Sequence, residues 1–206
     1  MAIKTMLGKA LVTHIRQDII LGLGTGTTVE ACIEALATSD TRPKEYVYSS
    51  LRTQQFAQQY GLQGVLMQDA MNIDLYIDGT DEIDEEFIAL KGAGGAMTGE
   101  QLCAKMASSF WFIAQANKQV KRLGAKMPLP VEVIPWAQSQ FSRFIVSIGG
   151  RPLLRGVKSE LGNPIIDCHG LSFAEPYKLA STIEAFPGVI GHGLFVKTRP
   201  SKLLVG

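Results

Sequence analysis

The chain has 206 residues, of which 46% are hydrophobic and 19% are charged. A chain of this size buries about 70% of its unfolded surface, so it needs no disulfide or metal staple and is not intrinsically disordered. Twenty Lys and Arg residues against 19 Asp and Glu residues give a net charge of +1, without the basic excess that nucleic-acid binding requires.

The first part of the chain alternates apolar strands with helices, and the sequence predicts these elements in order. They are a helix at 3–17, a strand, turn and helix over 18–37, a strand at 45–50, a helix at 52–61, strands at 64–67 and 75–77, a helix at 100–110, and a strand at 111–116. Near-continuous apolar strands between helices are typical of a parallel sheet that is covered on both faces. We therefore expect a doubly wound, Rossmann-like α/β domain.

The pattern changes near residue 127, where three prolines fall within eight positions. Strands at 131–134, 151–156, 163–169 and 188–196 and helices at 136–148 and 176–186 follow in the order β, α, β, β, α, β. This order indicates a ferredoxin-like α+β fold. We expect a catalytic domain at 1–126 plus 197–206 and a smaller inserted domain at 127–196, with the last strand returning to the first sheet.

Membrane, disulfide and metal sites are not expected. No apolar stretch reaches the ~18 to 20 residues that span a bilayer, and charged residues interrupt the N-terminus before a signal-peptide core can form. Cys32, Cys103 and Cys168 are odd in number and widely spaced, which favours reduced, buried thiols in a cytoplasmic protein. Neither the cysteines nor the histidines have metal-ligand spacing, so we predict no metal site. We also expect no cofactor.

A glycine-rich turn at 22–28, GLGTGTT, lies between an expected strand and an expected helix. Backbone N–H groups and the positive end of the helix dipole meet there, so the turn can hold an anion. Thr27 stands where the dinucleotide fingerprint needs its third glycine, and no lysine follows the glycines as in a P-loop. The hydroxyls of Thr25, Thr27 and Thr28 can donate to phosphate oxygens. The alternative is an ordinary turn with threonines as helix caps.

Acidic residues follow the apolar strand that ends near residue 77. Asp78 and Asp81 flank Gly79 and Thr80 at the carboxyl end of this strand, where parallel sheets bind their ligands. We expect at least Asp78 to face the cleft. The acids that come next are interpreted as a solvated loop and the start of a helix: Glu82, Asp84, Glu85 and Glu86.

The segment at 90–100, LKGAGGAMTGE, combines a lysine, a glycine run and a glutamate. It predicts a flexible backbone cradle with a cation, Lys91, at one end and a potential base, Glu100, at the other. The alternatives are a first-turn acid stabilised by the helix dipole for Glu100 and solvated surface lysines for Lys91 and Lys118.

Together these segments resemble the A type of ribose-5-phosphate isomerase. The matching stretches are GLGTGTTV (22–29), YIDGTDEID (76–84), LKGAGGAMTGE (90–100), IAQANKQVKRLG (113–124), PLPVEVIP (128–135) and FPGVIGHGLF (186–195). They occur in the family's order and span nearly the whole chain. The resemblance implies a metal-free enzyme that interconverts ribose 5-phosphate and ribulose 5-phosphate through a cis-enediolate, in the pentose phosphate pathway, as a homodimer or homotetramer.

The resemblance also implies roles for single residues. Glu100 matches the proton acceptor that moves a hydrogen between C1 and C2 of the sugar. Lys91 and the amides of Gly92, Ala93 and Gly94 match the group that stabilises the enediolate oxygen. Asp78 and Asp81 match the acids that hold sugar hydroxyls and assist ring opening.

Other matched residues contact the substrate. Those at the phosphate end are Thr25, Gly26, Thr27 and Thr28. Those near the sugar are Gly79, Thr80, Gly92, Ala93 and Gly94. Lys118 matches a substrate-binding lysine, and Lys4 adds positive charge to the same pocket. The chain departs from the family at Gln115, where members often carry Asp, and at Thr80, where Ala is frequent. Contacts to the sugar hydroxyls are therefore expected to differ.

Two rival interpretations come from other functional classes. A sugar-phosphate sensor domain of a transcriptional regulator shares the general fold but carries a DNA-binding helix-turn-helix, for which there is no room before the first strand. A coenzyme A transferase uses a glutamate that attacks a thioester, which requires an acyl adduct on Glu100. Such enzymes are usually longer than this chain.

Overall fold

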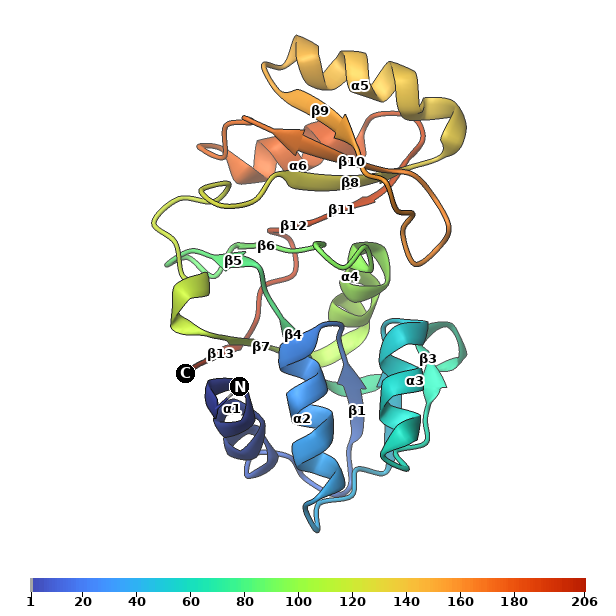
Figure 1. Ribbon diagram of the computed structural model, residues 1–206, viewed down its shortest axis with the longest axis vertical. Helices are drawn as coiled ribbons and strands as arrows, with labels where there is room; N and C mark the ends of the chain where they lie inside the picture. The colour runs from blue at the N-terminus through green and yellow to red at the C-terminus, as the bar shows by residue number, and fades with distance from the viewer. Residues whose placement is uncertain (1) are drawn as a thin grey trace. The chain divides into compact units, whose positions relative to one another are not determined.

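The computed structural model describes residues 2–206, which form two compact units (Figure 1). Unit 1 contains residues 2–80 together with Gly99–Lys118 and Pro200–Gly206. Unit 2 contains Asp81–Thr98 and Gln119–Arg199. The domain limits expected from the sequence, with a smaller domain at 127–196, stay a prediction.

Unit 1 is built on a six-stranded parallel sheet. Its strands, in spatial order, are β13 (Lys202–Val205), β7 (Ala107–Ala114), β4 (Ile73–Gly79), β1 (Ile20–Leu23), β2 (Glu45–Tyr48) and β3 (Val65–Leu66). The helices of this unit are α1 (Ala2–Val12), α2 (Thr27–Ala37) and α3 (Leu51–Gln59), and most of α4 (Met97–Met106) also belongs to it. The parallel α/β sheet expected from the sequence is confirmed, including the return of the last strand to its edge.

The topology of this sheet fixes where a ligand can bind. Strand β1 pairs with β2 on one side and with β4 on the other, so the strand order changes direction between β1 and β4. Ligands of open parallel sheets bind beyond the carboxyl ends of the strands at such a switch point. In unit 1 this position lies after Leu23 and Gly79.

The core of unit 1 is apolar and closely packed between sheet and helices. Leu21, Leu23, Ile33 and Leu36 are fully buried in it. Helix α1 contributes Leu7 and Leu11, whereas its Ile3 and Met6 are exposed. The prediction of a helix to residue 17 was wrong because the chain turns after Val12, where the N–H of His14 and Ile15 bond to Leu11 and Val12.

The boundary between α4 and β7 also differs from the prediction. A helix was expected to run to residue 110, but α4 ends at Met106 and β7 begins at Ala107. Residues of β7 pair with β4 from Ala107 onwards, opposite Ile73, and with β13 from Trp111. At residues 107–110, pairing with β4 satisfies backbone groups and outweighs the helical pattern of the side chains.

Unit 2 contains a four-stranded antiparallel sheet and a smaller three-stranded one. The first has the order β11 (Val189–His192), β8 (Leu129–Val133), β10 (Ile165–His169) and β9 (Arg151–Leu154), and the second has the order β12 (Leu194–Phe195), β6 (Ala89–Leu90) and β5 (Glu82–Ile83). Helices α5 (Gln138–Ser147) and α6 (Pro176–Glu184) supply Phe141, Ile145, Ala180 and Ile183 to the core of this unit. Along residues 129–192 the order is β, α, β, β, α, β, which is the ferredoxin-like arrangement.

The three cysteines, Cys32, Cys103 and Cys168, are buried and form no disulfide. Burial raises the pKa of the Cys32 thiol to about 12. Within residues 2–206, no helix is long and apolar enough to cross a membrane.

Candidate functional site

The glycine-rich turn leads from β1 into the N-terminus of α2. The N–H of Gly24 bonds to the carbonyl of Ile77 on the neighbouring strand, at 2.8 Å. Gly26 is the residue that caps α2, with a φ of 121° and no side-chain cap. The alternative of threonine caps is therefore wrong. Thr27 is exposed, and the Lys4 ammonium donates to its hydroxyl at 2.5 Å, so a cation lies at this helix N-terminus.

A cluster of hydroxyl groups supports the turn from the segment that leads from β2 into the first turn of α3. The Thr25 hydroxyl lies 3.1 Å from the Ser49 oxygen and 2.8 Å from the Ser50 oxygen. The Thr53 hydroxyl donates to the carbonyl of Gly24 at 2.8 Å. The three supporting residues are buried. Sequence reasoning missed them, although the pair of serines directly after β2 was a usable signal, because β2 ends at the same sheet edge as β1.

Asp78 connects the end of β4 to this turn. Its side chain is fully buried, and the Tyr76 hydroxyl donates to Oδ2 at 2.8 Å. The N–H groups of Gly79 and Thr25 donate to Oδ1 at 2.7 and 3.2 Å. A Cβ on Gly24 would lie only 2.0 Å from this carboxyl group. Asp78 thus lies at the expected sheet edge, buried among protein donors.

Glu100 lies in the first turn of α4, as the sequence predicts, and only 4% of its surface is exposed. The Glu100 carboxylate is therefore largely shielded from solvent, unlike most acidic side chains in a first helical turn. Burial is the main cause that raises the pKa of Tyr76, and the charges of Asp78, Cys103 and Glu100 raise it further. The same two carboxylates contribute to the raised pKa of the Cys103 thiol. Unit 1 therefore holds two buried carboxylates close to one buried phenol.

Helix α4 approaches the end of β2 through a glycine. A Cβ on Gly99 would meet the carbonyl oxygen of Ser49 at 2.5 Å, so only a glycine allows this close approach. Ser49 also contacts Thr25 in the glycine-rich turn. The residue before the candidate base is thereby packed against the hydroxyl cluster that supports the candidate phosphate site.

The other sequence-predicted residues of unit 1 follow the carboxyl ends of β4 and β7. Gly79 is half-buried and Thr80 is buried. Lys118 ends the short 3-10 helix η2 (Ala116–Lys118) directly after β7 and is half-buried, so it is not a fully solvated lysine. Because β4 and β7 are parallel neighbours, these residues follow the same edge of the sheet.

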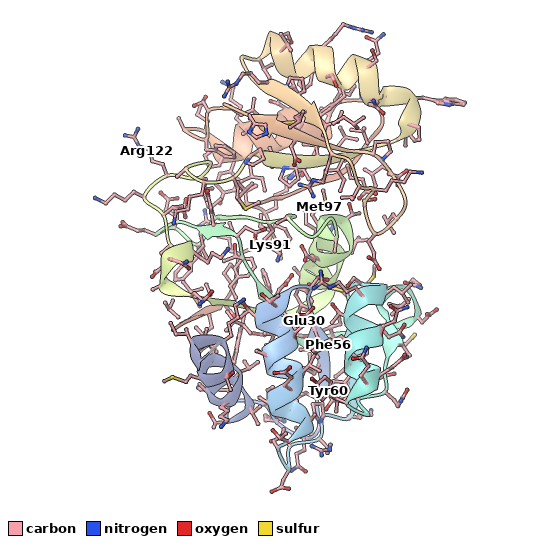
Figure 2. All side chains as sticks on the ribbon, in the orientation of Figure 1. Glu30, Phe56, Tyr60, Lys91, Met97 and Arg122 are labelled. Atoms are coloured by element: carbon pink, nitrogen blue, oxygen red, sulfur yellow. The ribbon has the colours of Figure 1, made fainter. Side chains whose placement is uncertain are left out.

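Lys91 belongs to unit 2 and is almost fully buried, with 3% of its surface exposed. Its N–H bonds to the carbonyl of Gly193 at 2.8 Å, and its ammonium lies 5.9 Å from the centre of the Phe195 ring. The surface-lysine alternative is therefore wrong. Figure 2 labels Lys91 and Met97, which flank the glycine segment.

The glycine segment between these two residues forms the expected backbone cradle, which we define as residues 92–95. Gly92 and Gly95 have φ values of 102° and 77°, which residues with side chains rarely adopt. The N–H of Gly95 bonds back to the carbonyl of Gly92 at 3.1 Å and closes the turn. Ala93 and Gly94 are exposed at its tip. The N–H of Ala93 donates to Oδ2 of Asp81 at 3.2 Å, so the structure brings Asp81 and the cradle together.

The solvated-loop interpretation holds for only part of the acidic run. Glu85 and Glu86 are exposed, but Glu82 is fully buried, which corrects the expectation for this residue. Its carboxylate accepts the N–H groups of Gly124, Lys126 and Met127 at 2.5–2.9 Å. No helix begins here, because the carboxylate of Asp84 accepts two N–H groups of a tight turn that leads into β6.

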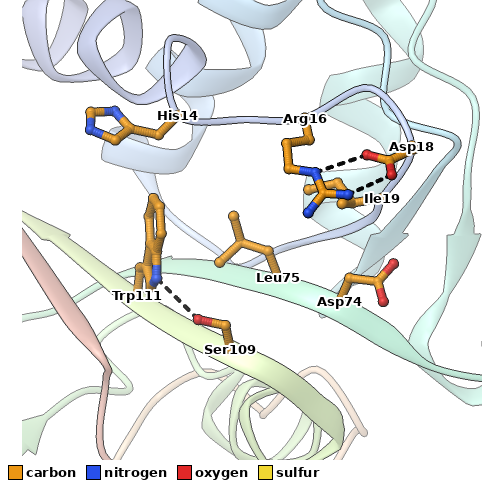
Figure 3. Close-up of a pocket in the computed structure, with 8 residues that line it drawn as sticks. All are labelled: His14, Arg16, Asp18, Ile19, Asp74, Leu75, Ser109 and Trp111. Carbon is orange, nitrogen blue, oxygen red and sulfur yellow. Dashed lines mark hydrogen bonds and ion pairs between the residues drawn. The ribbon is translucent and has the colours of Figure 1, made fainter.

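A separate hollow of about 410 Å³ lies in unit 1 near the amino ends of β1 and β4 (Figure 3). Its lining includes His14, Arg16, Asp18, Asp74 and Trp111. It lies at the opposite end of the strands from the residues predicted to bind phosphate. Among residues 2–206, no group of three or more His, Cys, Asp or Glu side chains could hold a metal ion.

Comparison with known proteins agrees with this arrangement. Residues 45–206 match the family model described as ribose 5-phosphate isomerase A (phosphoriboisomerase A). The chain belongs to this family.

Curated and solved relatives cover nearly all of the chain. Ribose-5-phosphate isomerase A of Acidithiobacillus ferrooxidans is 41% identical over 206 residues, which is 100% of this chain and 94% of that protein. The crystal structure of ribose 5 phosphate isomerase A from Neisseria gonorrhoeae has a TM-score of 0.94 at 34% identity, covering 98% of this chain and 91% of that one. A D-ribose-5-phosphate isomerase solved in complex with phospho-erythronic acid has a TM-score of 0.91 at 27% identity, with coverages of 98% and 93%.

Proposed function

We propose that this protein interconverts D-ribose 5-phosphate and D-ribulose 5-phosphate in the non-oxidative pentose phosphate pathway. The observation that carries the proposal is the buried Glu100 carboxylate in the first turn of α4, in a chain of this family. The reaction moves one hydrogen between two adjacent carbons, so it needs a base that removes the proton and returns it.

Glu100 is proposed as that base. It takes the proton from C2 of the open-chain aldose and delivers it to C1, through an enediolate, while the proton of the C2 hydroxyl passes to the C1 oxygen. Its burial keeps bulk water away from the proton during the transfer. The Gly99 contact with the Ser49 carbonyl fixes the start of the helix and limits the positions that the carboxylate can reach.

Lys91 and the cradle are proposed to stabilise the oxygen charge of the enediolate. Ala93 and Gly94 are exposed at the tip of the cradle, so a ligand can approach this segment. Preorganised N–H donors and a buried ammonium stabilise a developing oxyanion because they need no reorganisation during the reaction. Asp81, which accepts the Ala93 N–H, is proposed to hold a sugar hydroxyl and assist ring opening.

The anion turn is proposed to hold the phosphate group. Backbone N–H groups at the start of α2, the hydroxyls of Thr25, Thr27 and Thr28, and the ammonium groups of Lys4 and Lys118 are the groups that recognise it. Asp78, which is buried near the end of β4, is proposed to keep the turn in place. It is also proposed to assist opening of the sugar ring. The phospho-erythronic acid bound by a relative carries a phosphate and a carboxylate, which supports a phosphorylated sugar acid or sugar as the ligand class.

The association state and the compartment are also proposals. We propose a cytoplasmic homodimer or homotetramer. Large apolar side chains are exposed on unit 2, among them Trp136 at 93% and Val157 at 66%, and contact with a second copy would cover such side chains. The three free, buried cysteines fit a reducing compartment.

Glu100→Gln tests the proposed function. It keeps the size of the side chain and removes the base, so kcat should fall by at least ~10² while KM stays within a few-fold. The assay measures ribulose 5-phosphate formed from ribose 5-phosphate, with thermal unfolding as a check of the fold. Glu85→Gln, which changes an exposed loop acid in the same way, is the control and should keep wild-type turnover. Unchanged turnover of the Glu100 variant would remove Glu100 from the mechanism.

A further inference from the structure

Unit 2 contains an ion pair that has no role in the proposed isomerisation so far. Arg155 follows strand β9, and Asp167 lies on the adjacent strand β10. The guanidinium donates to the carboxylate through two nitrogens, from Nε to Oδ2 at 2.9 Å and from Nη2 to Oδ1 at 2.5 Å. Their side chains are only 15% and 14% exposed. Two such groups lose much of their hydration on folding, so the pair by itself is no evidence of stabilisation.

The third nitrogen of the guanidinium points away from Asp167 and reaches the cradle. Arg155 Nη1 donates to the carbonyl oxygen of Gly92 at 2.9 Å and to that of Ala93 at 3.2 Å. The Gly92 oxygen also accepts the N–H of Gly95, which occupies its second acceptor site. One guanidinium therefore holds two successive peptide groups of the segment that carries the proposed oxyanion donors.

Because peptides are planar, the contact between Arg155 and the carbonyl groups also determines where the N–H groups of the same peptides point. In a planar trans peptide the carbonyl and the N–H point in opposite directions. When Arg155 holds the carbonyls of Gly92 and Ala93, the N–H groups of Ala93 and Gly94 point away from the guanidinium. The N–H of Ala93 follows this rule, because it points to Asp81 and donates to its carboxylate. A cation on the carbonyl also polarises the peptide and makes its N–H a stronger donor.

The cradle depends on such support because its glycine-rich sequence does little to restrict its backbone conformation. Glycines populate several backbone conformations with similar energies, so Gly92, Gly94 and Gly95 do not by themselves fix the orientation of their peptides. Arg155 is itself held by the sheet, since its N–H bonds to the carbonyl of Ile165 at 2.9 Å. Through Arg155, the strand pair β9–β10 thus holds the carbonyl groups of this glycine-rich backbone in place.

We propose that Arg155, oriented by Asp167, is a positioning residue that sets the direction and donor strength of the Ala93 and Gly94 amides for the enediolate intermediate. This role rests on the isomerase function proposed above. The amides meet a full negative charge only after the proton has left C2. Loss of Arg155 therefore weakens binding of the transition state more than binding of the substrate.

The decisive variants are Arg155→Gln, Asp167→Asn and the double variant. Arg155→Gln should lower kcat by roughly 10- to 100-fold, less than the ~10²–10³ for removing an oxyanion donor outright, with KM within about three-fold. Asp167→Asn should give a smaller loss. Because Asp167 acts through Arg155, the double variant should be no slower than Arg155→Gln alone. The double variant also leaves no unpaired buried charge, so it tests the proposal even where a single variant folds poorly.

The matched control is Arg16→Gln. Arg16 forms the same two-nitrogen pair with Asp18, at 3.0 and 2.6 Å, but both side chains are mostly exposed (Figure 3). This variant should keep wild-type kcat.

A binding measurement separates positioning from a purely structural role. Phospho-erythronic acid, which a solved relative binds, carries a carboxylate as well as a phosphate. If the cradle amides bind this carboxylate as they bind the enediolate, its dissociation constant should rise in Arg155→Gln about as much as kcat/KM falls. The affinity for inorganic phosphate should stay unchanged, because phosphate occupies the anion turn of unit 1.

The outcomes distinguish the two proposals. An active wild-type enzyme whose double variant keeps full kcat overturns the role of Arg155 and leaves the isomerase function standing. The role of Arg155 is also overturned if the affinities for phosphate and for phospho-erythronic acid weaken equally. It is likewise overturned if the losses in kcat of the two single variants add up in the double variant. A wild-type chain without isomerase activity overturns the proposed function itself, and the role of Arg155 falls with it.

Discussion

At the residue scale, the contact between Gly24 and Asp78 shows how closely the glycine-rich turn depends on atoms of the neighbouring strand. The carboxylate of Asp78 occupies the space where a side chain of residue 24 would lie, and it accepts the N–H of Thr25. The glycine is therefore required by space and not by its backbone angles. The turn and the end of β4 form one structural element of the site.

This contact predicts the effect of Gly24→Ala. The new Cβ would lie 2.0 Å from the Asp78 carboxyl, so the variant should lose about 1–3 kcal/mol of unfolding free energy and much of its turnover. Urea denaturation and the isomerase assay measure the two effects. Gly156→Ala, whose Cβ would meet no atom within 4 Å, is the control and should change stability by no more than about 0.5 kcal/mol. A stable and active Gly24 variant would show that Asp78 can move without loss.

The sequence predicted the positions of the candidate site better than the surroundings of its side chains. Glu100 in a first helical turn, Lys91 before the cradle and the anion turn before α2 are local features, so motif spacing indicates them. The burial of Lys91 and Glu82 is not local. It depends on residues more than 40 positions away, such as Lys126 for Glu82, and the pattern around an acid cannot show which distant N–H groups it meets.

At the element scale, α4 combines a helix start with a close approach to β2. Gly99 is a poor helix former, yet it stands one residue before the proposed base. Helix propensity alone favours alanine there by about 1 kcal/mol. The contact with the Ser49 carbonyl opposes that preference, because a Cβ would lie 2.5 Å from the oxygen.

Gly99→Ala should therefore destabilise the protein despite its better propensity, and it should lower kcat because the adjacent Glu100 shifts with the helix. Thermal unfolding and steady-state kinetics provide the two readouts. Lys105→Ala, at an exposed position of the same helix, is the control that should affect neither. A Gly99 variant with a raised unfolding temperature would mean that propensity outweighs the contact.

Most elements of the fold could be predicted because strands and helices alternate with clear periodicity, and the boundaries were the weak point. The helix expected to run to residue 110 ends at Met106, because the following residues pair with β4. The first helix ends at Val12, although its apolar spacing continues to Ile15. In both cases a contact distant in sequence decides where the element ends, and no local window contains it.

At the scale of the whole molecule, unit 2 carries a buried group that makes stability depend on pH. Only 2% of the surface of His192 is exposed. Burial lowers the pKa of His192 although Glu184 acts to raise it. Burial would raise the pKa of Glu184, but Lys197 and His192 together lower it.

Acid should therefore destabilise the protein. As the pH falls below about 6.5, the unfolded chain binds a proton at His192 that the folded chain resists, so the free energy of unfolding decreases. The lowered pKa of Glu184 stabilises the folded state above the ordinary pKa of a glutamate, and this stabilisation is lost as the pH falls further. Glu184 and His192 therefore both make the protein less stable in acid. Melting curves at about pH 7.5 and pH 5.5 should show a lower unfolding temperature in acid. His192→Asn, whose amide oxygen can still accept the Leu194 N–H, should show a smaller drop. Equal drops would exclude His192 as the cause.

The division of unit 1 into three stretches of sequence affects the order of assembly during synthesis. Strand β13 leaves the ribosome only after every residue of unit 2, because that unit ends at Arg199. The four antiparallel strands of unit 2 can thus pair while β7 still has an open edge. Nascent chains would then carry a finished ferredoxin-like part beside an unfinished parallel sheet, and closing that edge is the last step of maturation.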